Sequence, residues 1–126
     1  MDEVRARVAD ALARGLRPAM SIRAALVSQA DGPPEGPPIE LTVVTEPGGA
    51  EGVIQQIEVA LREIGSLETV TPRAPDRASF QHNEASPVIE ARVVENTEDA
   101  LARVQRTLKG LTVLFDKDAL FGPRRP

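Results

Sequence analysis

The sequence contains one pattern twice: an apolar strand, a polar break, an amphipathic helix that ends at glycine, and another apolar strand. The first copy has its opening strand at residues 39–44 and its glycine at Gly65. The second copy has the same features at residues 88–94 and Gly110. Two such units within residues 39–116 constrain the fold strongly, because each unit joins two strands through a crossover helix.

The repeated unit predicts an α+β fold. We expect a ferredoxin-like split βαβ sandwich (βαββαβ), with a four-stranded antiparallel sheet, two helices on one face and an N-terminal helical arm. The first helix should bury Ile57 and the second should bury Leu101. No period is sustained between Thr71 and Pro87, so this segment is predicted to be a long loop. Such a fold serves many unrelated activities and does not name a function by itself.

The sequence predicts four segments. Residues 1–30 form an amphipathic helix followed by an extra segment at 20–29. The apolar alternation in this segment favours a strand, but its Ala and Leu residues also suit a helix. Residues 31–38 are rich in Pro and Gly and predict a stiff linker. The ferredoxin-like core covers 39–116, and a flexible tail covers 117–126.

The N-terminal helix has a narrow apolar stripe. Its apolar side chains recur every four residues, and charged residues lie mostly off that line. The stripe consists of Val4, Val8, Leu12 and Leu16. A short helix of this kind is not stable alone and must pack on something. One interpretation is a partner interface, in which the stripe docks in a groove of a larger protein.

Composition excludes several classes of site. The chain has no Cys, Trp or Tyr and one histidine, His82. The lack of Cys excludes disulfides, thiol catalysis and Cys-based metal centres, and the lack of sheet aromatics argues against an RNA-binding platform. Residues 39–116 carry seven Arg and Lys against thirteen Asp and Glu, a balance that repels phosphate backbones. We therefore predict no nucleic-acid partner, no cofactor and no metal.

The sequence also bears on localisation. No apolar run approaches the ~18 residues of a membrane span, and the first residues, which include Asp2 and Glu3, lack the features of a signal peptide. These observations predict a cytoplasmic protein without a membrane partner. The usage of Ala, Arg and Pro is bacterial in style.

The turn after the first core strand is the candidate ligand site. Gly48 and Gly49 let a ligand approach the backbone, and the free N–H groups of the following first helical turn attract a carboxylate. The alternative is that Pro47, Gly48 and Gly49 only turn the chain from strand to helix. Because Glu46 and Glu51 flank the turn, a zwitterion whose ammonium faces Glu46 is a better candidate than a simple anion.

Residues 41–49, the helix after them and residues 61–70 resemble the first βαβ unit of an ACT domain. In that family an apolar strand ends in an acidic residue, a Pro-Gly turn opens the helix, and a small-residue turn leads to the second strand. The family pattern places a large apolar residue soon after the Gly, which this chain delays to Val53. The resemblance, over residues 39–116, implies a regulatory module that binds an amino acid or similar ligand at this turn, usually across a dimer interface. The matching site residues are Glu46, Gly48, Gly49 and Ala50.

No catalytic constellation is visible in the sequence. His82 has polar neighbours but no nucleophile or second acid that the pattern places beside it, which predicts a solvated loop side chain. The predicted function is therefore that of a non-enzymatic small regulatory or assembly domain, which homo-oligomerises and binds a small amino-acid-like ligand at the turn. The alternative is a structural adaptor that docks a larger protein through its N-terminal helix.

Overall fold

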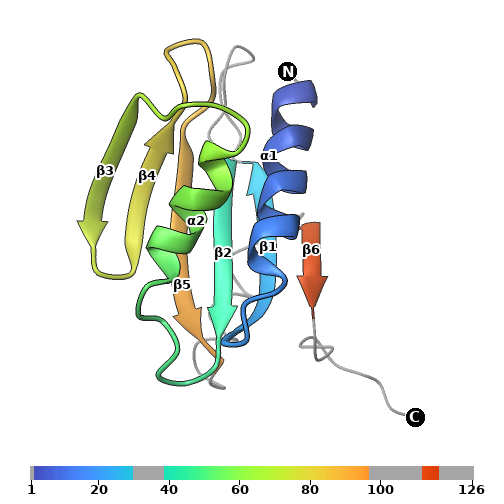
Figure 1. Cartoon of the computed structure of the whole chain (residues 1–126), viewed down its shortest axis with the longest axis vertical. Helices are drawn as coiled ribbons and strands as arrows, with labels where there is room; N and C mark the ends of the chain where they lie inside the picture. Colours follow the sequence, from blue (N-terminus) through green and yellow to red (C-terminus); the bar gives the residue numbers. More distant parts are fainter. Residues whose placement is uncertain (1, 30–38, 97–111, 117–126) are drawn as a thin grey trace.

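The fold is a mixed six-stranded sheet with two helices on one face, within the residues that the computed structural model describes, 2–29, 39–96 and 112–116 (Figure 1). The elements are α1 (Asp2–Leu16), β1 (Ile22–Gln29), β2 (Ile39–Thr45), α2 (Val53–Arg62), β3 (Thr69–Ala74), β4 (Arg77–Gln81), β5 (Ile89–Glu95) and β6 (Thr112–Asp116). The strand order is β3-β4-β5-β2-β1-β6. Strands β2 and β5 pair in parallel, and the other neighbours pair antiparallel.

The two helices are held to the sheet and to each other by apolar stripes. Helix α1 buries Val8, Leu12 and Leu16, whose spacing of four residues places them on one side of the helix. Helix α2 buries its own stripe of Val53, Ile57, Ala60 and Leu61. The helices approach closely at Gly15, where an added Cβ would lie 2.7 Å from the Cβ of Ala60.

The main core lies between the helices and the sheet. Alternate side chains of each strand point toward the helices, as the period of two requires. On β2 these are Ile39, Leu41 and Val43, and Phe80 of β4 is the largest fully buried side chain of this layer. The burial of Ile57 confirms the predicted face of α2.

The face of the sheet opposite α1 and α2 changes character from one edge to the other. Over β1 and β2 it carries a small buried apolar cluster of Ala24, Leu26 and Val44. Over β4 and β5 it is polar, and Arg77 and Glu90 are exposed. The polar area over β4 and β5 contains the site described below.

The α+β class is confirmed, but the four-stranded antiparallel βαββαβ arrangement is wrong. The segment 20–29, whose alternation favoured a strand, contains strand β1. This strand lies inside the sheet, between β2 and β6, and not outside the core. The sheet is mixed because β2 and β5, which the repeat predicts as first strands of two βαβ units, pair directly in parallel.

The predicted loop between Thr71 and Pro87 is also partly wrong. Strands β3 and β4 form a hairpin whose turn is Pro75 and Asp76, and β4 lies between β3 and β5. The alternation that would have indicated β4 is short. Ala78 and Phe80 point to the core and alternate with polar residues over only five positions.

The N-terminal helix is not a separate arm. Its stripe shares one buried cluster with the sheet and α2, so residues of the predicted segments 1–30 and 39–116 form a single core. Three predictions fall outside the described residues: the linker at 31–38, the helix that includes Leu101, and the tail at 117–126.

Candidate functional site

The turn between β2 and α2, predicted as a ligand site, is filled by contacts within the chain. The N–H of Gly48 donates to the Oε2 of Glu95 at 3.3 Å, and the N–H of Gly49 donates to the carbonyl of Glu46 at 2.8 Å. The carboxylate of Glu46 pairs with the guanidinium of Arg23 at 3.0 Å. The two glycine amides and the acid that would meet a zwitterion are therefore already engaged.

The two glycines of this turn have different roles. Gly48 has φ of 80°, a left-handed conformation that favours glycine, and an added Cβ there would meet nothing within 4 Å. At Gly49 an added Cβ would lie 2.9 Å from the Cβ of Ser21 and 3.1 Å from the carbonyl oxygen of Glu46. The close approach at Gly49 is thus made by the chain's own backbone and Ser21.

The rest of the turn adds little to a ligand site. Ala50 is half-buried and packs against the main core. The N-cap of α2 is Gly52, and no side chain caps the helix. A ligand site at Glu46, Gly48, Gly49 and Ala50 stays a prediction that these contacts do not favour.

The apolar stripe of α1 is occupied by the chain's own core. Val8, Leu12 and Leu16 are fully buried between α1, α2 and the sheet, and the side chain of Val4 lies outside the described residues. Docking of this stripe in a partner's groove would require α1 to leave the sheet. The adaptor hypothesis therefore loses the observation on which it rested.

A different site lies on the opposite face of the sheet, where strands β2, β5, β4 and β3 line a hollow of about 450 Å³. Small-molecule sites in proteins usually fall between about 300 and 1,000 Å³. Most of the side chains that line it are charged or carry a hydroxyl. We call it the charged pocket, and its polar lining is Glu40, Thr42, Arg73, Arg77, Ser79, Glu90 and Arg92.

Strand pairing sets like charges side by side in the charged pocket. Arg77 of β4 is the direct cross-strand partner of Arg92 of β5. Two residues along β5, Glu90 is the direct partner of Glu40 of β2. Like charges placed directly opposite each other destabilise a sheet. The pairing itself therefore sets two arginines opposite each other in one row of the pocket and two glutamates opposite each other in the next, and Arg73 bonds Ser79, which faces Glu90 in that second row.

The arginines of the charged pocket are held by hydroxyl groups. The Nε of Arg73 donates to the Oγ of Ser79 at 3.1 Å, and the Nε of Arg92 donates to the Oγ1 of Thr42 at 3.4 Å. Within the described part of the chain, none of Arg73, Arg77 and Arg92 forms an ion pair. Three guanidinium groups thus keep donors available for an acidic ligand.

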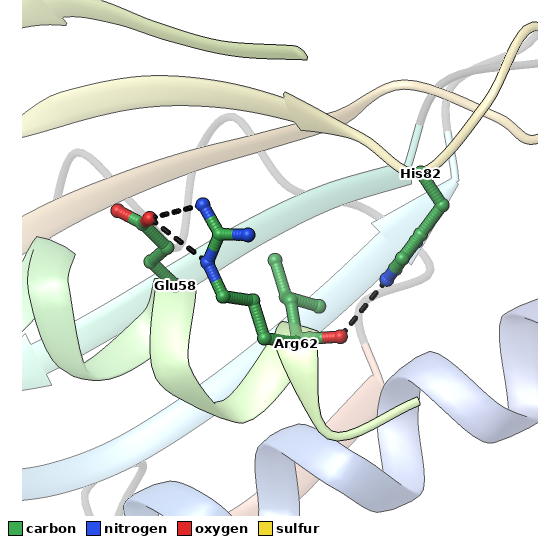
Figure 2. Close-up of polar contacts among 4 residues, drawn as sticks. Glu58, Arg62 and His82 are labelled. Atoms are coloured by element: carbon green, nitrogen blue, oxygen red, sulfur yellow. Dashed lines mark hydrogen bonds and ion pairs between the residues drawn. The ribbon is translucent and has the colours of Figure 1, made fainter. Parts of the chain in front are cut away.

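His82 does not lie in the charged pocket. Figure 2 shows its ring reaching from the segment after β4 to the last turn of α2, where Glu58 and Arg62 form an ion pair. Its Nε2 lies 2.9 Å from the carbonyl oxygen of Leu61 and must be the donor, because a carbonyl only accepts. His82 lies outside the strands, as predicted, but it is half-buried and therefore only partly solvated, and its contact with Leu61 is structural.

Two further observations concern the site and its setting. Over the described ranges 2–29, 39–96 and 112–116, no group of three or more His, Cys, Asp and Glu side chains is placed to hold a metal ion. In the same ranges neither α1 nor α2 is long and apolar enough to cross a membrane, and no further helix is described.

Comparison with known proteins does not assign the chain to a family. No protein-family model matches it, and neither a curated protein nor a solved structure is significantly similar to it. The resemblance to ACT domains stays a prediction. The functional argument therefore rests on the geometry of the charged pocket.

Proposed function

We propose that this chain is a small, non-enzymatic regulatory or assembly domain that binds a charged small molecule in the charged pocket. The pairing of Arg77 with Arg92 supports this most. Two guanidinium groups on neighbouring strands repel each other, and an anionic group bound between them offsets that repulsion. The proposal keeps the regulatory role expected from the sequence and moves the ligand from the turn to the sheet.

The lining of the pocket favours binding over catalysis. Its hydroxyl groups, on Thr42 and Ser79, accept hydrogen bonds from arginines. The described lining contains three arginines and two glutamates, a composition that suits recognition of a charged ligand.

The assembly part of the proposal rests on the edge of the sheet. Strand β3 pairs only with β4 in the described residues, and most of its side chains are exposed. A second copy could add its own edge there by backbone hydrogen bonds. Pro72 removes one backbone donor from this strand and limits how long such a pairing can be.

The test of the pocket compares simple anions across three variants. Citrate and inorganic phosphate at millimolar concentration should raise the melting temperature of the native chain by mass action. Arg77→Gln and Arg92→Gln should each reduce that increase by at least about half, because each removes one of two facing charges. Differential scanning fluorimetry measures the shift.

The matched control is Arg7→Gln, which removes the same charge from an exposed position on α1, across the sheet from the pocket. It should keep the full increase in melting temperature. An absent increase in the native chain, or an equal loss in all three variants, would contradict the proposed pocket.

A further inference from the structure

One row of cross-strand partners in the charged pocket contains positive charges and a hydroxyl. Arg77 of β4 faces Arg92 of β5, and Arg92 faces Thr42 of β2 on its other side. We call these three residues the arginine row. The next row along the strands is mixed in charge, since it contains Glu90 and the hydroxyl that Arg73 bonds. An anionic group is therefore expected to bind at the arginine row.

The arginine row is supported by a buried hydroxyl. Thr42 is only 2% exposed, and its Oγ1 accepts a hydrogen bond from the Nε of Arg92 at 3.4 Å. This contact uses one of the five N–H donors of Arg92 and leaves those of its two terminal nitrogens for a ligand. Arg92 is half-buried, whereas Arg77 is exposed. The row thus presents one guanidinium that the protein orients beside one that faces solvent.

The two guanidinium groups favour one shape of anion. Each guanidinium is a planar fork that donates two parallel hydrogen bonds to an anionic group. A carboxylate has two oxygens in one plane, so a single fork engages both of them. A phosphoryl group has three terminal oxygens and a charge of about −1.5 to −2 at pH 7. It can therefore accept from two forks that approach from different sides, and its charge matches that of two facing arginines.

We infer that the charged pocket recognises the phosphoryl group of a small phosphomonoester, bound between Arg77 and Arg92. This inference rests on the proposed function and adds the chemical class of the ligand. The volume of about 450 Å³ is within the range of small-molecule sites. Residues 39–116 carry seven Arg and Lys against thirteen Asp and Glu, which opposes a long polyanion but not a single phosphoryl group at two arginines.

The test compares three compounds that present one phenyl group on different anions. They are phenyl phosphate, phenyl sulfate and benzoate, each titrated into the full chain at neutral pH by isothermal titration calorimetry. Phenyl sulfate has the tetrahedral shape with a single negative charge, and benzoate has a planar anion. We expect phenyl phosphate to bind about fivefold more tightly than phenyl sulfate, the effect of one partly exposed ion pair. Benzoate should bind most weakly.

Lysine variants separate the shape of the fork from its charge. Arg77→Lys and Arg92→Lys keep the positive charge but cannot donate two parallel hydrogen bonds. Each should therefore reduce the advantage of phenyl phosphate over benzoate. Arg7→Lys, at an exposed position on α1, is the matched control and should leave all three affinities unchanged.

A further titration distinguishes the source of the phosphoryl group. A short phosphoserine peptide carries the same group on a larger body and should bind no more tightly than phenyl phosphate. Tighter binding of the peptide would assign the arginine row to a phosphorylated protein and overturn the small-molecule ligand.

The outcomes distinguish this inference from the proposed function. If benzoate binds as tightly as phenyl phosphate, or if both lysine variants leave their ratio unchanged, the selectivity for a phosphoryl group is overturned while anion binding in the pocket stands. If phenyl sulfate binds as tightly as phenyl phosphate, the second charge plays no part and the inference is overturned. If none of the three compounds binds, both proposals fail.

Discussion

Single residues of the β2–α2 turn show why a glycine in a motif does not by itself indicate a ligand. Gly48 is required by its left-handed backbone, and Gly49 by the nearness of Ser21 and Glu46. Both requirements come from folding. The sequence shows that glycines are needed here, but it does not distinguish a close approach by a ligand from one by the chain itself.

Substitution of Gly49 should harm the fold, because the space beside its Cα is taken up by the chain itself. Gly49→Ala should lower the free energy of unfolding by about 1–3 kcal/mol, the usual effect of overpacking. The new Cβ would overlap Ser21 and crowd the carbonyl of Glu46. Urea denaturation followed by circular dichroism measures the change.

A double-mutant cycle identifies the cause. In a Ser21→Gly background the overlap with the Ser21 side chain is gone, so Gly49→Ala should be less destabilising there than in the native chain. Equal effects in both backgrounds would show that Ser21 is not the neighbour that excludes a side chain at position 49.

At the scale of elements, the sequence predicted helices and strands well wherever the apolar period was long. The stripe of α2 places Ile57 in the core as expected. The period of four in α1 correctly marked one apolar side of that helix, but Leu12, assigned to a partner interface, lies in the chain's own core. Strand β4 was missed because its alternation covers only five residues. Helix packing was also out of reach, because the contact between Gly15 and Ala60 joins positions far apart in the sequence.

That helix contact gives a prediction opposite in sign to helix propensity. Alanine in place of a helical glycine usually stabilises a helix by about 1 kcal/mol. Gly15→Ala should instead destabilise this chain, because its Cβ would lie 2.7 Å from that of Ala60. Thermal unfolding should show a lower melting temperature.

The partner position supplies the control for this substitution. Combining Gly15→Ala with Ala60→Gly moves the methyl group from one helix to the other and should recover part of the loss. A melting temperature that rises in the single variant Gly15→Ala would mean that α1 and α2 are further apart than described.

At the scale of the whole molecule, strand order decides where the charges meet. Glu40, Arg77 and Arg92 lie on three strands, and only the order β4-β5-β2 brings them onto one face. The repeat predicts which segments are strands but not which strands are neighbours, and the two inserted strands β1 and β4 were not placed by it. The charged pocket therefore could not be predicted from the sequence. The sequence shows only that polar residues stand two apart within a strand, as Glu90 and Arg92 do, and such residues share one face of that strand.

The central claim is that the ligand binds on the sheet and not at the β2–α2 turn, and a backbone NMR titration tests it most directly. With citrate added to the ¹⁵N-labelled chain, we predict that the amide signals of Ser79, Ala91 and Arg92 move progressively, while those of Gly48 and Gly49 stay nearly fixed. Amide shifts concentrated at Gly48 and Gly49, with Ser79, Ala91 and Arg92 unchanged, would contradict the account and return the ligand site to the turn.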